Sequence, residues 1–326
     1  MSVRTNFTKS FRKVALSLFA GLLSFSGLAF AQFACPPDPV APSPQVLQGW
    51  FRDAPERGFL WEIEKSGRKS WLFGTIHMGK AHWVGFGPKT LSRLRSADVI
   101  ALEFAATEVT SMVEFQSQIA VLAKADQANP LPPRLQERLF QTAANNCVAT
   151  DMIKALPLSL ALLAAAMNGH RKDGFEPAFG IDNFVEGFAR GAGKPIVALE
   201  TITTQVRAIG ELLRNDRDTA VTQMLDELDS GETRAQLKKF ASVWESADHD
   251  ALSSYQRWCN CVKTEREIKL IEQLNDARNP AMADGIDAIH SRGKSVFAAV
   301  GSLHFTGPKA LQDLMARKGY VVRVVR

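Results

Sequence analysis

Short apolar runs in the chain alternate with longer stretches of helical periodicity. The runs FLWEIE and SWLFGTI, residues 59–64 and 70–76, are separated by KSGRK, and this pattern predicts a β-hairpin with a glycine-containing turn. Four further strands are predicted at 98–104 (DVIALEF), 194–200 (KPIVALE), 295–304 (SVFAAVGSLH) and 320–325 (YVVRVV).

Helices are predicted between these strands. The stretches 108–170 and 205–278 are mostly helical in pattern, and the segment 156–168 (LPLSLALLAAAMN) is apolar almost all round. This segment is too short to span a membrane, so we interpret it as a buried helix. Shorter helices are predicted at 88–97 (PKTLSRLRSA), 181–193 (IDNFVEGFARGAG), 282–294 (MADGIDAIHSRGK) and 308–319 (PKALQDLMARKG).

The strand cores VIAL, PIVAL and VFAAV lack any alternation of polar and apolar residues. A strand of this kind has both faces covered, as in a largely parallel sheet that lies between helices. The opening hairpin must be antiparallel, so the sheet is expected to be mixed. The predicted fold class is therefore α/β, with a mixed, largely parallel central sheet flanked by helices. Residues 108–170 and 205–260 are expected to form a helical insertion or cap.

The N-terminus has the composition of a secretory signal peptide over residues 1–31. Residues 1–13 carry four basic and no acidic residues, an apolar run follows, and the run ends in Ala29-Phe30-Ala31. We expect cleavage after Ala31 and export to the periplasm or the medium, with no stable membrane span left in the mature chain. An uncleaved membrane anchor is the alternative, because the apolar run is nearly long enough to span.

The remaining chain divides into a leader and a domain. Residues 32–57 are rich in proline and lack periodicity, which predicts a leader, and residues 58–326 are expected to form the α/β domain. The full sequence has 39 basic and 34 acidic residues, a formal charge of +5, but four of the basic residues lie in the signal peptide. The mature chain therefore carries 35 minus 34, or +1. This gives no support for a nucleic-acid partner.

All four cysteines lie in the predicted mature chain. An even number of cysteines in an exported protein predicts disulfides. Cys259 and Cys261 are separated by one residue and are expected to be too close to bridge each other comfortably. Each is therefore expected to pair with Cys35 or Cys147. A soft-metal site is the alternative, but a CNC sequence without a nearby histidine is a poor zinc pattern.

Polar side chains stand where the predicted core strands end. These residues are His77, Glu103, Glu200 and His304. Ligands of open α/β sheets bind outside the carboxyl ends of the strands, so parallel strands would bring all four side chains to one rim. Gly74 and Gly301 each precede a histidine by three residues, and we expect them to let the backbone turn or approach a ligand closely.

Two imidazoles with one or two carboxylates suit a divalent metal such as zinc, manganese or cobalt, and they also suit metal-free acid–base chemistry. The alternative is that each residue is only a hydrogen-bonded corner of the fold. His82, five residues after His77, is a secondary candidate. The other histidines, His170, His249 and His290, are predicted to lie at the surface.

Several ordered motifs give the chain a resemblance to a known family. The motifs are WLFGTIHMG, ALEF, GIDNFVEGFARGAGKPIVALETITTQ, LNDARNPAMADGI and FAAVGSLHFTGPKALQDLMARKGYVV. From about Phe59 to the C-terminus the sequence resembles the TraB/GumN family, which includes the animal Tiki proteases. The resemblance implies an α/β fold like that of the ChaN and erythromycin-esterase proteins.

The resemblance also implies site residues. Tiki proteases are metal-dependent and are proposed to use both Gly-x-x-His motifs and a following glutamate, which match His77, His304 and Glu103. The family's Arg-Asn pair matches Arg278 and Asn279. The aspartate of its Gly-x-Asp motif matches Asp182, and the glutamate of its Leu-Glu-Thr motif matches Glu200.

The leading hypothesis is an exported metal-dependent hydrolase, with a peptidase as the expected kind and a peptide or small molecule as the substrate. One glutamate would help to hold the metal, and the second would be a general base. Arg278 would hold a substrate carboxylate or stabilise an oxyanion, and Asn279 would donate a hydrogen bond there. The alternative role of Asn279 is a helix C-cap before Pro280.

Two other functions remain open. A protein of this fold could bind haem or iron in the periplasm without catalysis. Tyrosine is a common haem ligand, yet Tyr255 and Tyr320 are the chain's only tyrosines and neither ends a predicted core strand. The other alternative is a metal-free esterase that uses a histidine and a glutamate.

Overall fold

The computed structural model describes residues 35–326 apart from 41, 106–108, 212 and 214–215. The predicted signal peptide and its cleavage site after Ala31 lie outside the described residues. Six described strands form one central sheet in the order β4-β3-β5-β2-β1-β6. The strands are β1 (Phe59–Lys65), β2 (Arg68–Thr75), β3 (Val99–Leu102), β4 (Ile196–Ala198), β5 (Val296–Gly301) and β6 (Val321–Val324).

The sheet is mixed and mostly parallel. Strand β5 pairs in parallel with β2 and with β3, and β3 pairs in parallel with β4. Strand β1 is antiparallel to both β2 and β6. The predicted fold class is therefore confirmed, including the opening hairpin. Every residue of β3 and β5 is buried, because these strands lie inside the sheet and are covered on both faces. Strand β4 departs from this expectation, since it is an edge strand and Val197 and Ala198 are exposed.

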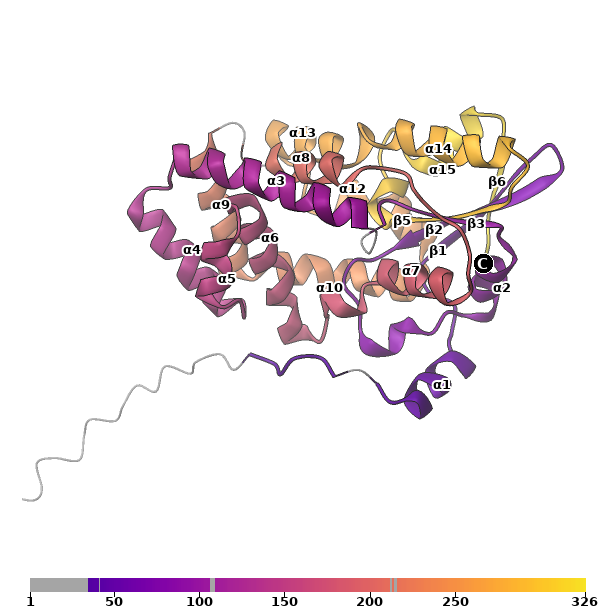
Figure 1. The fold of residues 1–326 in the computed structure, drawn as a ribbon, viewed down its shortest axis with the longest axis horizontal. Helices are drawn as coiled ribbons and strands as arrows, with labels where there is room; N and C mark the ends of the chain where they lie inside the picture. The colour runs from indigo at the N-terminus through magenta and orange to yellow at the C-terminus, as the bar shows by residue number, and fades with distance from the viewer. Residues whose placement is uncertain (1–34, 41, 106–108, 212, 214–215) are drawn as a thin grey trace, which may run out of the picture. The chain divides into compact units, whose positions relative to one another are not determined.

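Helices surround the sheet and form most of the remaining described chain (Figure 1). The α-helices are α1 (Pro44–Arg52), α2 (Pro88–Ser96), α3 (Val109–Ala128), α4 (Pro133–Asn145), α5 (Thr150–Ala155), α6 (Leu158–Gly169), α7 (Ile181–Gly191), α8 (Ile202–Glu211), α9 (Arg217–Ser230), α10 (Glu232–Glu245), α11 (His249–Ser253), α12 (Tyr255–Trp258), α13 (Glu265–Ile271), α14 (Asn279–Ser291) and α15 (Leu311–Arg317). Shorter turns of helix are η1 (Ala81–Val84), η2 (His170–Asp173), η3 (Pro177–Phe179), the π-helical η4 (Glu272–Asp276) and η5 (Ser302–Phe305).

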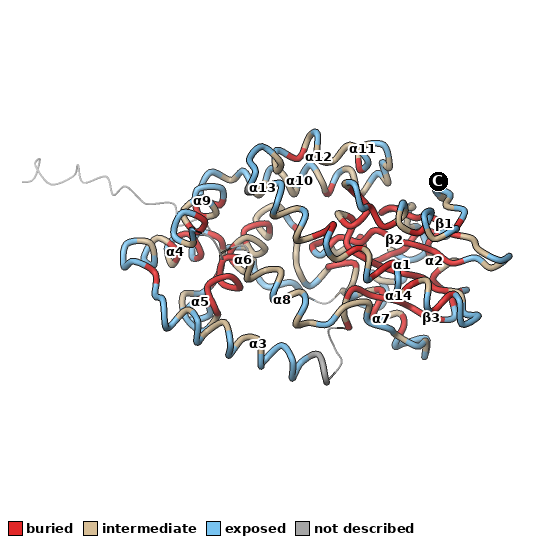
Figure 2. Tube along the Cα trace, turned by 90° about the horizontal axis from the view of Figure 1, so that it is seen from above, coloured by how far each residue is buried: buried red, intermediate tan, exposed pale blue. Residues whose placement is uncertain are grey.

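The helices divide between the sheet and a helical region. Figure 1 shows α14 and α15 on one face of the sheet and α7 on the other. Helices α4, α5, α6 and α9 pack together around a second apolar core that includes Leu139, Leu162 and Val221. The buried residues in Figure 2 concentrate in the sheet and in this second core. Helix α6 is largely buried, as its sequence predicted. Within the described residues, no helix combines the length and apolarity needed to cross a bilayer.

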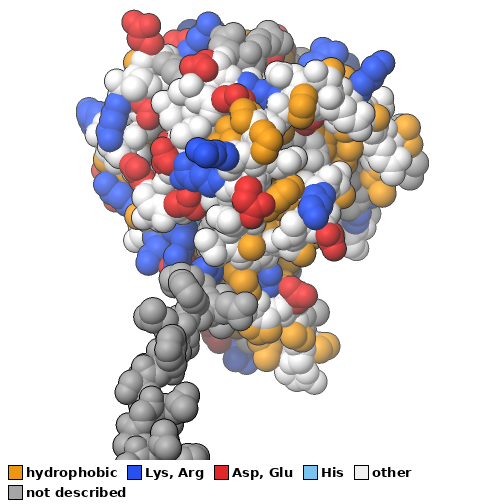
Figure 3. All heavy atoms as spheres, turned by 90° about the vertical axis from the view of Figure 1, so that its left-hand side faces the viewer, with side chains coloured by type: hydrophobic (Ala, Val, Ile, Leu, Met, Phe, Trp, Pro, Cys, Tyr) orange, Lys and Arg blue, Asp and Glu red, His pale blue; other side chains and the backbone are white. Residues whose placement is uncertain are grey.

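The end of the helical region, on the left in Figure 1, is shown in Figure 3. On this face acidic and basic side chains are interspersed with hydrophobic ones. Neither sign of charge forms a continuous field there, which agrees with the small net charge of residues 32–326.

The leader is more structured than its sequence predicted, because it contains helix α1. Ser43 caps this helix by accepting from the backbone N–H of Val46 at 3.4 Å, and Pro44 supplies the first-turn backbone angle. The helix packs closely on the chain after η1, where a Cβ added at Gly85 would lie 2.4 Å from the carbonyl oxygen of Trp50. The sequence signal for the start of this helix is only one serine followed by one proline, and it could not be distinguished from the other prolines of the segment.

The disulfide pairing corrects the sequence prediction. Cys35 is bonded to Cys147, and Cys259 is bonded to Cys261, so none of the four cysteines is free. Asn260 takes a left-handed backbone conformation (φ 58°) and brings the two flanking Cα atoms to 5.1 Å. That separation lies in the normal range for a disulfide, so one intervening residue is enough.

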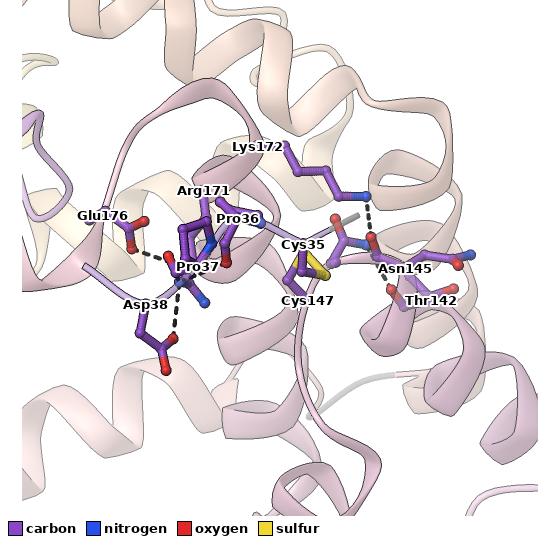
Figure 4. The surroundings of a disulfide bond; sticks show 11 residues. Cys35, Pro36, Pro37, Asp38, Thr142, Asn145, Cys147, Arg171, Lys172 and Glu176 are labelled. Atoms are coloured by element: carbon purple, nitrogen blue, oxygen red, sulfur yellow. Dashed lines mark hydrogen bonds and ion pairs between the residues drawn. A yellow bond between two sulfur atoms is a disulfide. The ribbon is translucent and has the colours of Figure 1, made fainter. Parts of the chain in front are cut away.

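The Cys35–Cys147 bond fixes the start of the described chain to the helical region (Figure 4). Arg171 strengthens this attachment, because its Nη2 donates to the carbonyl oxygens of Pro36 and Pro37 at 3.3 and 2.9 Å. The same nitrogen lies 3.1 Å from Asp38 Oδ1, and Arg171 Nε donates to Glu176 at 2.9 Å.

The three histidines predicted at the surface are instead wholly or partly buried. His290 is 2% exposed, and its ring contacts Ser70 Oγ at 2.8 Å and the carbonyl oxygen of Lys65 at 3.1 Å. His170 is 6% exposed, and His249 lies against Phe59. Their sequence contexts are polar, but each ring is turned toward the core by the helix that carries it.

We expect His170 to make the protein acid-labile. Burial lowers the pKa of His170 to about 4, whereas the unfolded chain has a pKa near 6.5. The unfolded state therefore binds the proton first as the pH falls, and stability is lost between pH 6.5 and 4. This residue should contribute a loss of about 2 kcal/mol between pH 7 and pH 5. Urea unfolding of the wild type and His170→Gln at both pH values measures it, and an equal loss in both proteins would contradict it.

The two disulfides should differ in their effect on stability. Residues 35 and 147 are 112 positions apart, so Cys147→Ser should cost about 5 kcal/mol in the chain-entropy model. Cys261→Ser opens a loop with a separation of only 2 and should cost about 2 kcal/mol or less. Urea unfolding without reductant gives both values. Non-reducing peptide mapping is the control, and a peptide linking Cys35 to Cys259 would disprove the pairing.

Candidate functional site

The carboxyl ends of the parallel strands meet at one edge of the sheet and bring the predicted residues together. Glu103 directly follows β3, and His77 follows β2. His304 lies in η5, directly after β5, and Glu200 follows β4. The parallel order β4-β3-β5-β2 places these four chain positions side by side at this rim.

Glu103 occupies the centre of the rim and is 6% exposed. Its Oε1 accepts the backbone N–H of Gly301 at 2.5 Å. Its Oε2 accepts from Gln205 Nε2 at 3.0 Å and from Arg278 Nη2 at 3.3 Å. His304 Nε2 lies 3.7 Å from Oε1. The carboxylate thus joins β3 to β5, to α8 and to the start of α14.

The charge of Glu103 follows from these neighbours. Burial acts to raise its pKa, but the interactions with His304, His77 and Arg278 outweigh burial and hold the pKa below its usual range. Arg278 stays charged at any physiological pH. Glu103 is therefore a buried carboxylate anion.

Asn279 fixes the orientation of His304. Its Nδ2 donates to two backbone carbonyl oxygens, those of His304 at 2.9 Å and Lys309 at 2.8 Å. Since carbonyls only accept, the amide cannot be flipped, and Oδ1 must face His304 Nδ1 at 2.5 Å. His304 Nδ1 therefore carries the proton that it donates to Asn279.

The opposite nitrogen of His304 is left as an acceptor. Burial, the largest effect, lowers the pKa of His304 to about 4, so the ring is neutral at pH 7. With the proton on Nδ1, the lone pair of Nε2 remains, and this nitrogen lies 3.7 Å from Glu103 Oε1. Two buried acceptors thus face each other with no proton between them.

His77 is held in a related way but carries a charge. Its Nδ1 donates to Asp182 Oδ2 at 2.7 Å, and Thr75 Oγ1 donates to the other carboxylate oxygen. The negative charge of Asp182 is the main reason that the pKa of His77 rises to about 9. The side chain is 55% exposed, so a cationic imidazole stands at the mouth of the rim.

The two glycines make room for side chains. Neither has a left-handed backbone conformation, so backbone strain does not require glycine at these positions. A Cβ added at Gly301 would lie 2.8 Å from Glu103 Oε1 and 3.2 Å from His77 Nε2. At Gly74 it would lie 2.9 Å from Ser302 Oγ. The empty side-chain position of Gly301 therefore lets Glu103 and His77 approach each other.

Arg278 and Glu200 form a buried ion pair. Arg278 Nε lies 3.0 and 3.1 Å from the two Glu200 oxygens, and Nη2 also contacts Glu200. Arg278 Nη1 donates to the carbonyl oxygen of Leu274 at 2.8 Å. The Glu200 side chain is 3% exposed.

This pairing changes the roles that the sequence predicted. Glu200 is neutralised by Arg278 and shielded from solvent, which does not suit a general base. Arg278 already donates to Glu200, Glu103 and a backbone carbonyl, and these contacts position Glu103. The amide N–H groups of Asn279 are also fully used, and this residue begins α14 instead of capping a helix end.

The secondary candidate His82 belongs to a different cluster. It lies in η1, and its Nε2 faces Glu245 Oε1 at 3.7 Å. Glu245 also accepts from Lys80 and Trp83. Burial is the largest of several effects that lower the pKa of His82.

A small pocket opens at the rim beside His77, Glu103 and Asp182, with Asn183 and Glu186 of α7 on its wall. Four residues at the rim were not predicted as site residues from the sequence: Asn183, Glu186, Thr75 and Gln205. Thr75 could have been found, since it precedes His77 by two residues on an extended segment and shares its face. Gln205 reaches Glu103 only through the packing of α8, and no sequence signal predicts that.

The geometry of the rim bears on metal binding. Among the described histidine, cysteine, aspartate and glutamate side chains, no three are already spaced as metal ligands are. The donor chemistry nevertheless fits a divalent ion, because one bare imidazole nitrogen and one carboxylate oxygen face each other beside a second imidazole.

Comparison with known proteins identifies the family. The model of the TraB/PrgY/gumN family matches residues 59–324. The chain belongs to this family. The resemblance inferred from the ordered motifs is thereby confirmed. The match does not concern Tiki proteases, so the relation to them stays a prediction.

A relative from Shigella flexneri agrees with membership of the TraB/PrgY/gumN family. This protein, named uncharacterized protein YbaP, is 24% identical over 260 residues, which cover 76% of this chain and 88% of the relative. No solved structure matches the chain.

Asn279 should be needed for both stability and the His304 tautomer. Replacing it in Asn279→Leu leaves two buried carbonyls and His304 Nδ1 without partners, so we expect a loss of about 3 kcal/mol or more. Urea unfolding measures this loss, and ¹⁵N NMR of the wild type should show a neutral His304 protonated at Nδ1. Asn168→Leu, which removes one helical hydrogen bond, is the control. A wild-type proton on Nε2 would contradict the assignment.

Proposed function

We propose that this member of the TraB/PrgY/gumN family is an exported hydrolase that works with a divalent metal ion, zinc, manganese or cobalt, and acts on peptides. His77, His304 and Glu103 would hold the ion, and His77 would release its Nε2 proton when the ion binds, because only a neutral imidazole nitrogen is a ligand. The observation that carries the proposal is the pair of buried acceptors, His304 Nε2 and Glu103 Oε1, at 3.7 Å.

The pair needs a positive partner to be stable. Glu103 Oε1 gains a hydrogen bond from the Gly301 N–H, but it gains none from His304 Nε2, so two lone pairs face each other in a buried place. Asn279 holds the histidine proton at Nδ1, so His304 cannot supply a proton to Glu103. A divalent cation would satisfy both atoms, and imidazole nitrogen and carboxylate oxygen are its common ligands.

The surrounding residues support the same function. In metal sites, the second nitrogen of a ligating histidine usually donates to a carboxylate or carbonyl-type oxygen. Here Asp182 accepts from Nδ1 of His77, and Asn279 accepts from Nδ1 of His304. The Nε2 atom of each ring therefore points away from that hydrogen-bond partner. Gly301 keeps the space between His77 and Glu103 free of a side chain. A bound ion would polarise a substrate carbonyl and lower the pKa of a water toward about 7.

Metal-free acid–base chemistry is the second candidate. His77 is 55% exposed and paired with Asp182, so its imidazolium lies within reach of solvent and substrate. With a pKa of about 9 it carries its proton at pH 7, which suits a general acid for a leaving group. Activity that survives complete chelation would favour this candidate.

Haem binding is not favoured by the described contacts. Tyr320 donates to Asp287 at 2.8 Å, and Tyr255 packs against Phe240 and Trp258. Neither tyrosine belongs to the contacts of the rim.

Export is supported by the sequence and by the cysteines. The basic start, the apolar run and the Ala-x-Ala ending favour cleavage after Ala31. Two disulfides fit an oxidising compartment.

The metal proposal predicts that His77 and His304 act on one centre. Residues 32–326 should bind zinc, manganese or cobalt in equilibrium dialysis, and His77→Ala and His304→Ala should each weaken binding by about a hundredfold. The double variant should lose little more, because one site is already broken. His82→Ala, a histidine paired with Glu245 elsewhere, is the matched control and should bind normally.

Hydrolysis is measured separately on a quenched-fluorescence peptide library. Activity should require added metal and disappear in both rim variants. Equal metal binding by all the proteins would refute the shared site. Metal binding at the rim without hydrolysis of any peptide would refute the peptidase and leave a binding protein.

A further inference from the structure

A second pocket lies away from the rim and is larger. It has a volume of about 500 Å³ and is lined by residues 56–58, 60, 89–90, 246–250 and 325–326. These segments are the start of β1, the first turn of α2, the loop that leads into α11, and the chain after β6. We call it the Arg57 pocket. Its volume is within the range of small-molecule sites.

Unpartnered buried atoms gather at the Arg57 pocket. In the described part of the chain, six buried side-chain nitrogen or oxygen atoms have no hydrogen-bond partner. Three of the six belong to two lining residues: Arg57 Nε, His249 Nδ1 and His249 Nε2. Leaving such atoms unpaired costs about 1–3 kcal/mol each. Both residues line one cavity, but these three atoms are themselves shielded from solvent, so a ligand would contact them only after the two side chains turn toward the cavity.

The charges around the pocket leave Arg57 without a carboxylate. Within the described chain, no carboxylate lies within salt-bridge distance of its guanidinium, and its Nη1 makes one long contact of 3.5 Å to the carbonyl oxygen of Gly85. The charge of Glu245 acts on Arg57, but the oxygens of Glu245 are bonded to Lys80 and Trp83.

The carboxylates of the pocket wall have other partners. Glu56 accepts the backbone N–H groups of Lys89 and Thr90 at 2.5 and 3.2 Å, at the start of α2. Asp248 accepts the N–H of Ala251 at 2.9 Å and caps α11. Asp250 faces Arg326, on the other side of the pocket, at 3.9 Å.

His249 supplies a second kind of contact. Its ring is perpendicular to Trp61, with centroids 4.7 Å apart, and also meets Phe59 edge-on at 5.4 Å. Burial lowers the pKa of His249 to about 4, so the ring is neutral and one nitrogen has no proton. An N–H pointed at an aromatic ring would satisfy one nitrogen. The other nitrogen still requires a hydrogen-bond donor.

We propose that the Arg57 pocket binds a carboxylate that has a hydrogen-bond donor next to it. The carboxylate would pair with the guanidinium of Arg57, and the ring of His249 would turn toward the cavity so that its bare nitrogen accepts from the donor. A hydroxy acid and the C-terminal residue of a peptide both have this chemistry, since an alcohol or amide group adjoins the carboxylate. The proposal does not rest on the metal or on hydrolysis at the rim.

The test uses N-acetylglycine as the probe with residues 32–326. Isothermal titration calorimetry should show saturable binding, and the ring-proton NMR signal of His249 should shift in the wild type. Acetate lacks the donor and N-acetylglycinamide lacks the carboxylate, so each should bind at least tenfold more weakly. Lactate should bind if a hydroxy acid is accepted, whereas binding of N-acetylglycine alone indicates a peptide end.

Variants locate the binding site. Arg57→Gln should weaken binding at least tenfold, because an ion-paired hydrogen bond is lost. His249→Phe keeps the aromatic packing and should weaken it by a smaller factor. Arg52→Gln makes the same charge change on an exposed arginine and should have no effect. His77→Ala should also bind normally, which separates this pocket from the rim.

Three outcomes would overturn the proposal. The first is equal binding by inorganic phosphate, which would show an anion site without selectivity for a carboxylate. The second is wild-type binding that saturates without any shift of the His249 signal. The third is the absence of saturation, which would show that N-acetylglycine has no specific site on the protein. The wild-type NMR measurement keeps the test valid if a variant fails to fold.

Discussion

The buried carboxylate of Glu103 is the interaction on which the rim depends. An anion that is 6% exposed is stable only where donors surround it, and here the donors come from separate elements. The backbone of Gly301 joins it to β5, Gln205 joins it to α8, and Arg278 joins it to the start of α14. The carboxylate therefore joins two strands of the sheet to α8 and to the start of α14. Loss of that charge would take this partner from the Gly301 N–H and from Gln205, whereas Arg278 would keep Glu200.

The two Gly-x-x-His motifs are alike in sequence but differ in their protonation. Each histidine donates its Nδ1 proton to a side-chain oxygen, but Asp182 is an anion and Asn279 is neutral. The negative charge of Asp182 keeps His77 charged, whereas burial beside a neutral amide keeps His304 neutral. One rim thus contains a proton donor and a bare lone pair. A repeated motif does not imply a repeated role, because the partner of the second ring nitrogen decides the charge.

Much of the fold could be predicted because it follows from burial. The uninterrupted apolar runs of β3 and β5 identify covered strands, and parallel strands necessarily end at one edge, which is why His77, Glu103 and His304 meet. The pairing of Arg278 with Glu200 could not be predicted, since it depends on how α14 packs. The Cys259–Cys261 bond also escaped prediction, because it depends on the left-handed backbone of one asparagine.

The neighbours Arg278 and Asn279 show how the backbone completes the rim. Successive residues of a regular helix point about 100° apart, yet both of these side chains reach the same site. They follow the π-helical turn η4, whose wider spacing ends just before them. Asp276 of that turn accepts the N–H of Lys309, and the carbonyl of Lys309 accepts from Asn279. The irregular turn therefore sets the start of α14 so that one residue holds the carboxylate and the next holds the imidazole.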